Sequence, residues 1–587
     1  MRTRTENVSL NEVSVGRALR STLVAILLTC VAGSFPLVAQ SISEASAIAD
    51  QAITTARAGN TREALSLYEK ALSIAPDKME ILRDYAIVLG WAGRYSEAIP
   101  VIKKVRAMEN NQPDWALREF ASVYLFGDRT EEALHQYNAL VEQGDVSEQT
   151  LNRRALSLRW LGRRDEALAS YSELVQRYPK SVAGIVGVAY AKADMGQLSA
   201  ALHDLESNRN VPQDDPEILK ARIRILNWIG RHYEAQKLIA TLPGPLVNDR
   251  EILEDRIAAA RWGGDPNGAM QELGRFSQLF PGSQSQRMTR ELRTEFGHSF
   301  SPYFSFAKDS DGLMDRKAGG DGSIHLNPSY SVHFGYQYRW LEQQQSIRTL
   351  IQYNLGLSGN LHPRVSFYST IGSVDYRMDG LERKYIGDAS LTVAASDRLR
   401  ISGGGGSVAM DAYQSLPNQV TAPFGFGDVS FNLSSKMKFQ ARYSRFSFSD
   451  GVVRDRADSQ VGRSIFRQTH LKLVAGWRFN WMRNSIATSD FWSPLRFQSN
   501  VAFVEGEGRI TSWMDYYGEL AGGWQSELGS PIQHPFQVNG HIAIHPNRHW
   551  RTVLEAGKST SSLDRALPGQ RNYSRWFTSA TMEFRFP

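Results

Sequence analysis

Three histidines near the C-terminus have the spacing of metal ligands on a helix. His541, His545 and His549 recur every four residues, and imidazole is a common zinc ligand. The residues around them, however, alternate between apolar and polar as in a strand, and Pro546 interrupts the stretch. We therefore expect His549 to begin the next strand, and the sequence predicts no metal site here.

Other residue types that carry chemistry occur without the partners that an enzyme needs. Asp309 with Asp311, and Glu505 with Glu507, have the spacing of paired carboxylates, but no nucleophile or cleft is indicated beside them, so we expect solvated side chains. The glycines at 403–406 lack the helix that follows a phosphate-binding loop and are expected in a strand that approaches its neighbour closely. No Walker loop, His-Glu-x-x-His motif or cysteine pair is present. The sequence predicts neither a catalytic site nor a cofactor.

Four tryptophans recur at one position of a repeating pattern. Trp91, Trp160, Trp228 and Trp262 each precede a glycine by two residues. Exposed indoles stack on flat apolar faces, including those of sugar rings, so one hypothesis makes these residues a groove for a polymer or a partner. The alternative is that each indole packs against the helix of the next repeat.

The pattern behind these tryptophans is a repeat of 34 to 35 residues that extends from about residue 45 to 285. A marker alanine, in Glu-Ala-Leu or a similar triplet, follows a glycine seven times in phase, and this is the tetratricopeptide period of two helices and their turns. The alanines are Ala64, Ala98, Ala133, Ala167, Ala201, Ala235 and Ala269, and the glycines are Gly59, Gly93, Gly127, Gly162, Gly196, Gly230 and Gly264. We expect an all-α superhelix at residues 40–290, an architecture that usually recruits a partner.

The N-terminus has the composition of a secretory signal peptide at residues 1–39. Basic residues precede an apolar run at 23–38 that ends among small residues. Cleavage after Ala39 would remove Cys30, which is the only cysteine. In an alternative interpretation Cys30 is the lipidated first residue of the mature chain. Both interpretations predict an exported protein.

From residue 295 to 587 the apolar spacing changes from the helical period to the period of two that strands have. The mean hydropathy of −0.36 is too low for a bundle of apolar spanning helices, whereas strands with one apolar and one polar face suit a transmembrane antiparallel β-barrel. Residues 576–586 end such a strand in an aromatic residue, as the last strand of outer-membrane barrels commonly does. These 293 residues accommodate about 14 to 18 strands, most simply 16. A soluble sandwich or propeller is the alternative.

The positive charge of the chain is concentrated in this second half. Residues 295–587 carry 31 basic and 25 acidic side chains, which accounts for the whole net charge of +6. A barrel of this size encloses an aqueous lumen. We expect Arg339, Arg348, Arg478 and Arg585, which lie on polar strand faces, to line that lumen and to favour neutral or acidic cargo.

A signal peptide, helical repeats and a barrel, in this order, resemble the exopolysaccharide export porins, namely the outer-membrane exporter of poly-β-1,6-N-acetyl-D-glucosamine and the cellulose export subunit. Residues 56–65 and 84–94 are similar to the start of the helical array of the first, and residues 491–497, with Phe-Trp-Ser-Pro, are similar to a barrel segment of the second. The resemblance implies export of a polysaccharide across the bacterial outer membrane during biofilm matrix formation, with the array in the periplasm. The implied partners are the polysaccharide chain, a periplasmic polysaccharide-modifying enzyme, the inner-membrane synthase complex and outer-membrane lipids, and no nucleic acid.

Two features differ from these relatives. Seven repeats are fewer than cellulose exporters carry, and the lumen of the poly-N-acetylglucosamine exporter is expected to be acidic to suit a partly cationic chain, whereas the balance here is positive. One alternative function is an outer-membrane scaffold or surface receptor, in which the polar inserts at 308–323 and 411–423 plug the barrel. Another is a barrel-anchored enzyme.

Overall fold

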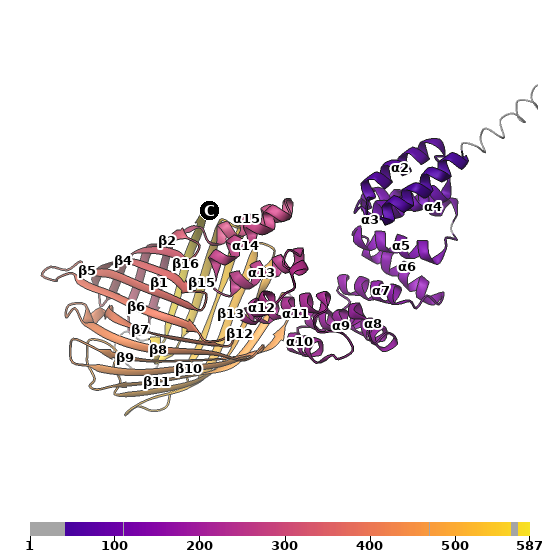
Figure 1. Cartoon of the computed structure of the whole chain (residues 1–587). Helices are drawn as coiled ribbons and strands as arrows, with labels where there is room; N and C mark the ends of the chain where they lie inside the picture. The colour runs from indigo at the N-terminus through magenta and orange to yellow at the C-terminus, as the bar shows by residue number, and fades with distance from the viewer. Residues whose placement is uncertain (1–41, 110, 469, 565–572, 587) are drawn as a thin grey trace, which may run out of the picture. The chain divides into compact units, whose positions relative to one another are not determined.

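The computed structural model describes residues 42–109, 111–468, 470–564 and 573–586 (Figure 1). The predicted signal peptide and Cys30 lie outside these residues. The chain divides into two compact units, one formed by residues up to 195 with 209–211, and one formed by residues 196–208 and from 212 onward. Among the described residues, no helix is both long and apolar enough to cross a membrane.

The predicted tetratricopeptide array is confirmed as successive helix pairs. A helix at residues 42–57 pairs with α2, and six further pairs and α15 follow. The helices of the first unit are α2 (Thr61–Ile74), α3 (Met79–Trp91), α4 (Tyr95–Met108), α5 (Asp114–Phe126), α6 (Thr130–Glu142), α7 (Glu148–Trp160), α8 (Arg164–Arg177) and α9 (Val182–Asp194). Those of the second unit are α10 (Leu198–Ser207), α11 (Pro216–Ile229), α12 (His232–Ala240), α13 (Arg250–Trp262), α14 (Pro266–Leu279) and α15 (Ser283–Glu295), with the short turn η1 (Gly244–Leu246) before α13.

The marker residues of the repeat explain why the helices pair. All seven marker alanines are fully buried, because a small side chain lets two helix backbones approach closely. Each turn between paired helices contains one residue with positive φ, which glycine adopts without strain. In the third turn this residue is Asp128, with φ 62°, and not the predicted Gly127. With Asp128 in place of Gly127, the turn residues follow the same steps as the alanines.

The second half forms the predicted closed antiparallel barrel, and β1 pairs with β16 to complete the ring of 16 strands. Closure leaves no strand edge without a partner, as a spanning barrel requires. The strands are β1 (His298–Asp309), β2 (Met314–Asn327), β3 (Tyr330–Gln343), β4 (Ser346–His362), β5 (Val365–Tyr376), β6 (Lys384–Ala394), β7 (Leu399–Ala409), β8 (Thr421–Ser434), β9 (Met437–Ser447), β10 (Val453–Arg467), β11 (Lys472–Asn484), β12 (Arg496–Thr511), β13 (Met514–Glu527), β14 (Phe536–Asn547), β15 (Trp550–Ser559) and β16 (Arg575–Phe586). The short turns η2 (Tyr413–Ser415) and η3 (Ser562–Asp564) lie in loops between strands.

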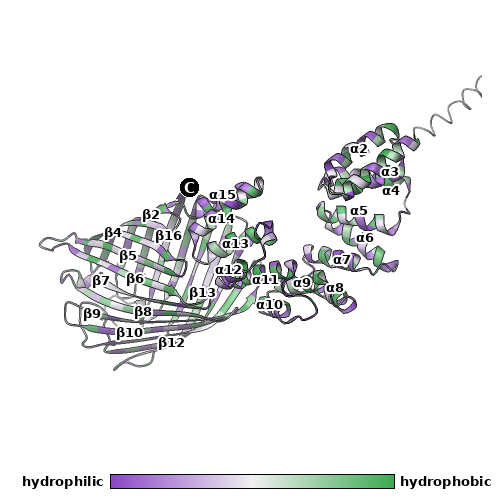
Figure 2. Ribbon diagram, in the orientation of Figure 1, coloured by the Kyte–Doolittle hydropathy of each residue, from purple (hydrophilic) through white to green (hydrophobic). Residues whose placement is uncertain are grey.

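Apolar and polar side chains alternate along the strands, and Figure 2 shows this alternation around the barrel. In β3, for example, Phe334 and Tyr336 lie on the exposed outer face, whereas Ser331 and Arg339 are buried on the other face. The outer face therefore has the apolar surface that lipid requires, and the inner face is polar.

The two ends of the barrel differ in their connections. At one end, strands are joined by turns of two to four residues, such as 363–364 and 395–398. At the other end lie longer connections, including 410–420 and 485–495. Function in barrels commonly resides in such longer loops.

Helices of the second unit contact the short turns of the barrel. Asp397, in the turn between β6 and β7, accepts hydrogen bonds from the backbone N–H groups of Tyr233 (2.9 Å) and Glu234 (3.2 Å), and so caps the N-terminus of α12. The Tyr233 hydroxyl donates to the carbonyl of Pro363 at 3.0 Å, and the Arg364 guanidinium lies 4.3 Å from the Tyr233 ring centroid. A partly buried cap and a ring contact thus join helix and strand segments in this unit.

Candidate functional site

The four predicted tryptophans are among the most exposed apolar residues of the helical array. Trp91, Trp160, Trp228 and Trp262 expose 46%, 48%, 44% and 51% of their surface. About half of each indole is thus covered by neighbouring side chains, and a groove for a polymer or a partner at these residues stays a prediction. In these four repeats the position that precedes the turn residue by two therefore presents an aromatic surface to solvent.

The same position in the three remaining repeats holds Arg57, Phe126 and Asp194, which the sequence analysis missed. Phe126 precedes Asp128 by two residues and is 38% exposed, and Asp194 precedes Gly196. Phe126 was missed because Gly127 was taken as the turn residue, which shifts the register by one. Asp194 accepts a hydrogen bond from Arg159 at 2.6 Å, so in this repeat the position carries a charge instead of an aromatic ring.

Contacts in the first unit hold Trp91, Phe126 and Trp160 in place. We call these three residues, together with Trp228 and Trp262, the exposed aromatic row. The Trp91 indole N–H donates to Glu119 at 3.1 Å. Phe126 and Trp160 meet edge to face with 5.7 Å between ring centroids, and the Arg153 guanidinium lies 4.9 Å from the Phe126 ring. Rings that are fixed in this way lose little entropy when a ligand stacks on them.

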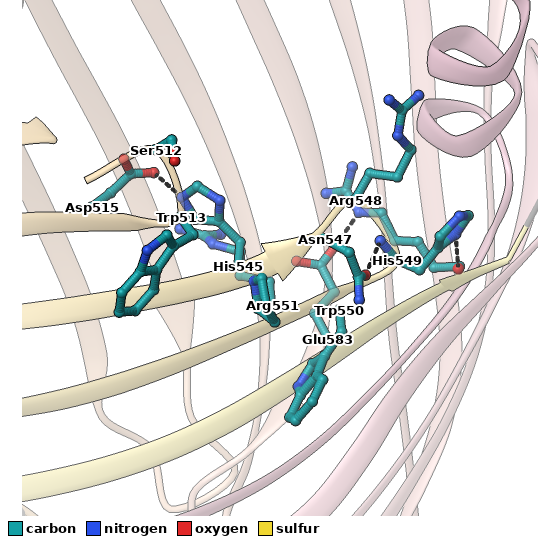
Figure 3. Close-up of a pocket in the computed structure, with 12 residues that line it drawn as sticks. Ser512, Trp513, Asp515, His545, Asn547, Arg548, His549, Trp550, Arg551 and Glu583 are labelled. Carbon is teal, nitrogen blue, oxygen red and sulfur yellow. Dashed lines mark hydrogen bonds and ion pairs between the residues drawn. The ribbon is translucent and has the colours of Figure 1, made fainter. Parts of the chain in front are cut away.

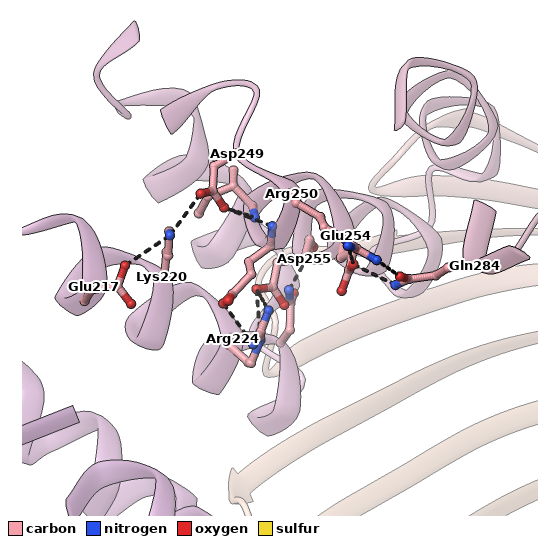
Figure 4. A network of polar contacts seen from close by, with 11 residues as sticks. Glu217, Lys220, Arg224, Asp249, Arg250, Glu254, Asp255 and Gln284 are labelled. Carbon is pink, nitrogen blue, oxygen red and sulfur yellow. Dashed lines mark hydrogen bonds and ion pairs between the residues drawn. The ribbon is translucent and has the colours of Figure 1, made fainter. Parts of the chain in front are cut away.

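A charged network crosses the helices of the second unit (Figure 4). Lys220 bridges Glu217 at 3.1 Å and Asp249 at 2.9 Å, and Asp249 also caps the N-terminus of α13. Arg224 reaches Asp255 at 3.2 Å. Burial raises the pKa of Asp255 to about 6, although Arg224 works in the opposite direction. The network therefore contains one carboxyl that titrates near neutral pH.

Arg339, the first of the predicted lumen arginines, is buried on the inner face of the barrel. Its guanidinium donates to both oxygens of Asp315, at 2.8 and 2.9 Å, and also to Asp411. Arg339 is 6% exposed and Asp315 is 5% exposed. The pair is bidentate and nearly dry, and Asp315 also lies 3.5 Å from Arg575.

The loop 410–420 lies against the inner wall beside this pair. Tyr413 and Leu416 pack in one apolar cluster with residues of β3, β4 and β5. The Arg348 guanidinium donates to the Tyr413 carbonyl and lies 4.0 Å from the Tyr413 ring. The other members of the cluster are Leu313, Leu341, Leu350, Val374 and Tyr376. Arg348 therefore anchors a loop.

The two remaining predicted arginines also have carboxylate partners. Arg478 donates to both oxygens of Glu519 at 3.3 and 3.2 Å, and Arg585 donates to Glu583 at 2.7 Å. The four arginines lie on β3, β4, β11 and β16, and the structure does not bring them together in one cluster. A role of these arginines in cargo selection remains a prediction.

Charge is distributed unevenly over the inner face. On β7 to β11 cations predominate, and on β12 to β16 carboxylates predominate. The cations of the first wall are Arg400, Lys438, Arg442, Arg454, Arg456, Lys472 and Arg478, beside Asp428 and Asp458. The carboxylates of the second wall are Glu505, Glu507, Asp515, Glu519, Glu527, Glu555 and Glu583, beside Arg509, Arg551, Arg575 and Arg585. The lumen thus has a basic wall and an acidic wall.

The three C-terminal histidines have separate partners, and β15 begins at Trp550, so the prediction that His549 begins this strand is wrong by one residue. His545 hydrogen-bonds to Asp515 at 2.9 Å and lies in a pocket at the short-turn end of the barrel, with Trp513 and Trp550 (Figure 3). His541 stacks on Tyr517 with 5.3 Å between centroids. His549 hydrogen-bonds to the carbonyl of Arg585 at 3.1 Å. No group of metal-ligating side chains occurs within the described part of the chain.

The predicted carboxylate pairs are likewise occupied by structural contacts. Asp309 accepts a hydrogen bond from the backbone of Leu313 at 2.8 Å and so closes the β1–β2 turn. Glu507 pairs with Lys472 at 2.6 Å. Residues 308–323 lie almost wholly in β1, this turn and β2, so they form no plug.

Comparison with known proteins gives partial matches. Tetratricopeptide repeat models match residues 56–119 and 151–181. Among solved structures, a bacterial polysaccharide outer membrane secretin is 14% identical, with 49% of this chain and 98% of that chain covered and a TM-score of 0.44. A tetratricopeptide repeat protein from Parabacteroides merdae is 16% identical, with 43% and 98% covered and a TM-score of 0.36. PilF of Pseudomonas aeruginosa is 19% identical, with 36% and 99% covered and a TM-score of 0.26. No curated protein matches the sequence.

The class of protein follows from the fold. A tetratricopeptide array precedes a closed barrel of 16 antiparallel strands in one chain. This is the layout of the exopolysaccharide export porins that the sequence resembles. The closed barrel, with its apolar outer face, indicates an outer-membrane protein.

Proposed function

We propose that this protein exports a polysaccharide through its barrel, with the tetratricopeptide array in the periplasm. The observation that carries the proposal is the closed 16-strand barrel with a polar inner face, because a barrel of this size encloses an aqueous passage. The exposed aromatic row of the array supplies a second surface suited to sugar rings.

The polymer that we favour is of the poly-N-acetylglucosamine or cellulose type and is secreted during biofilm matrix formation. Because the lumen has a basic wall on β7 to β11 and an acidic wall on β12 to β16, it suits a neutral chain better than a strongly charged one. Transport also requires many weak contacts, since the chain must enter and then leave. Polar side chains on the inner face and exposed rings on the array meet that requirement.

We assign the array two tasks that the same surface can perform. It guides the polymer, or it recruits a periplasmic polysaccharide-modifying enzyme and, through it, the inner-membrane synthase complex. Tetratricopeptide arrays bind partners along an extended surface of stacked repeats. The tryptophans at 91, 160, 228 and 262 are the residues on which we place this contact.

The second candidate function, a scaffold or surface receptor with a closed barrel, is favoured by one observation. The loop 410–420 is anchored on the inner wall through Asp411, Tyr413 and Leu416. A receptor needs such a plug permanently, whereas an exporter must be able to move it.

Secreted polysaccharide from cells with and without the gene separates the two functions. Linkage-specific hydrolases identify any polymer that disappears from the medium. We expect one polymer to be lost from the surface and to accumulate as trapped chain in the periplasm. Unchanged polymer outside the cell would favour the receptor.

A further inference from the structure

A row of phenylalanines lies on the inner face of β8 and β9, where the neighbouring positions are polar. Phe424 and Phe426 alternate with outer-face residues along β8, and Phe446 lies opposite Phe424 on β9. Further toward the short turns, the same face of β8 continues with Asp428 and Ser430. The inner wall therefore changes from polar to aromatic along a single pair of strands.

The rings of this row are nearly parallel. The centroids of Phe424 and Phe426 are 6.2 Å apart with 16° between the ring planes, and those of Phe424 and Phe446 are 5.4 Å apart with 22°. Phe446 and Phe448 continue the row at 6.0 Å and 18°. The result is a band of stacked apolar rings that extends toward the long loops.

At the side of the long loops, this band joins an apolar cluster that holds its last rings in place. Phe448 is 6% exposed and Phe491 is 1% exposed, and they contact each other with 4.8 Å between centroids. Both belong to an apolar cluster with residues of the loop 410–420. Phe424, Phe426 and Phe446, in contrast, are only half buried. Phe446 also packs against this cluster, so packing explains one end of the row and leaves Phe424 and Phe426 partly uncovered.

Glycines on the adjacent strand keep one side of the rings open. In the register of β7 with β8, Gly404 lies opposite Phe426 and Gly406 lies opposite Phe424. A Cβ atom at Gly404 would approach the carbonyl oxygen of Ala389 to 2.3 Å, so the close strand approach itself requires glycine. No side chain from these positions of β7 covers the two rings.

Polar groups lie on both sides of the space that Gly404 and Gly406 leave beside the rings. Across β7, Asp388 of β6 lies opposite Gly406, and Ser390 lies opposite Gly404. On the other side, the Arg442 guanidinium lies 4.2 Å from the ring of Phe426 and 3.7 Å from Asp428. Flat rings next to carboxylate, hydroxyl and guanidinium groups match a sugar, which has apolar ring faces and an edge of hydroxyl groups.

We propose that Phe424, Phe426 and Phe446 form a stacking track in the lumen for the pyranose rings of a polysaccharide. The proposal rests on the export function and names the surface along which the chain moves. Stacking does not depend on a particular hydroxyl pattern, so successive sugars slide from ring to ring with similar contacts. The track thus supplies weak, repeated binding sites of the kind that conduction requires.

Two triple variants of the full-length protein in detergent micelles test the track. Phe424→Leu, Phe426→Leu and Phe446→Leu together keep apolar side chains but remove the flat faces. Phe424→Tyr, Phe426→Tyr and Phe446→Tyr keep the rings. The probe is cellohexaose, a neutral chain of six pyranoses, and the measured quantity is its dissociation constant from ligand-observed NMR. Heat-dependent migration in SDS gels verifies that each barrel is folded.

We expect the Leu variant to bind cellohexaose at least about tenfold more weakly than the Tyr variant, because three ring contacts are lost. Any binding by the tryptophans of the array is the same in both variants and cancels. Equal affinity of the two variants, or no detectable binding by the wild type, would overturn the track. Export itself is measured separately, by the amount of secreted polymer. If the track fails this test while secretion is intact, the export function is still supported.

Discussion

The helical array and the barrel use the same residue types, aromatic rings and ion pairs, in different surroundings. In the array, rings such as Trp91 and Trp262 are about half exposed, and pairs such as Arg94–Glu97 expose 41% and 51% of their side chains. In the barrel, Arg339 and Asp315 expose only 8% and 6%. Electrostatic energy depends on burial. The buried ion pairs therefore position the loop end of the barrel, whereas exposed pairs such as Arg94–Glu97 contribute little to the stability of the array.

The largest expected effect is the loss of the buried pair in the barrel. Asp315→Ala leaves Arg339 with a buried charge and without its bidentate partner, which costs about 3 to 5 kcal/mol. The free energy of unfolding from urea titration of the protein in micelles measures this cost. The matched control is Glu97→Ala, which removes an exposed pair and should lower the free energy of unfolding far less. Equal effects of the two substitutions would contradict the view that the buried pair of the barrel stabilises the fold more than the exposed pair of the array.

Asp255 tests whether burial or the region of the chain determines the effect of a charge, because it is a buried carboxyl within the array. Burial raises its pKa from 3.8 to about 6 in the folded chain. Between these values the folded state holds a proton that the unfolded state has lost, so this group favours folding below pH 4 and loses its contribution as pH rises through 6. The difference at pH 7 is about 2 to 3 kcal/mol.

Urea unfolding followed by circular dichroism at several pH values measures this linkage. Asp255→Asn cannot titrate, so the stability difference between the wild type and this variant should change between pH 4 and 7. A constant difference would show that Asp255 keeps an ordinary pKa.

Packing in the array provides a smaller effect with an internal control. A Cβ atom at Gly187 of α9 would lie 2.2 Å from the Tyr171 ring, whereas one at Gly274 of α14 would meet nothing within 4 Å. Gly187→Ala should therefore destabilise the helices by about 1 to 3 kcal/mol. Gly274→Ala should stabilise them by about 0.5 to 1 kcal/mol. Thermal unfolding of each variant gives both values, and the same sign for both would contradict the packing account.

The smallest effect on stability is expected at the exposed row. Replacing Trp91, Trp160, Trp228 and Trp262 by Ala should change the unfolding free energy less per site than a core substitution does, because about half of each indole is already in solvent. The rate of polymer secretion should nevertheless fall several-fold, since the stacking surface is lost. Quantification of surface polymer, with correctly inserted protein verified by fractionation, tests this. Unchanged secretion would reduce these residues to surface features.

The sequence predicted the fold well where a period is present. Seven alanines at steps of 34 to 35 residues predicted the helix pairs, and an alternation of two predicted the strands and their number. The turn at Asp128 was misplaced by one residue, because glycine is not the sole residue type that tolerates positive φ there.

The sites were less predictable, because they depend on contacts between distant segments. Asp411 lies 72 residues from its partner Arg339, and no local pattern links them. The phenylalanine row also depends on the register of three strands, which places glycines at 404 and 406 beside rings at 426 and 424. The glycine run was correctly interpreted as a close strand approach, but the rings across from it were not recognised.

Passage of polymer through the lumen is the central claim, and a reversible block tests it most directly. Ser430 faces the lumen on β8, and Val429, its neighbour, faces outward. In a mature chain without Cys30, Ser430→Cys is modified with a bulky reagent that attaches through a disulfide, and Val429→Cys is the control. We predict that modification at 430 stops secretion, that reduction restores it and that the control is unaffected. Continued secretion with residue 430 fully modified would contradict export through the barrel.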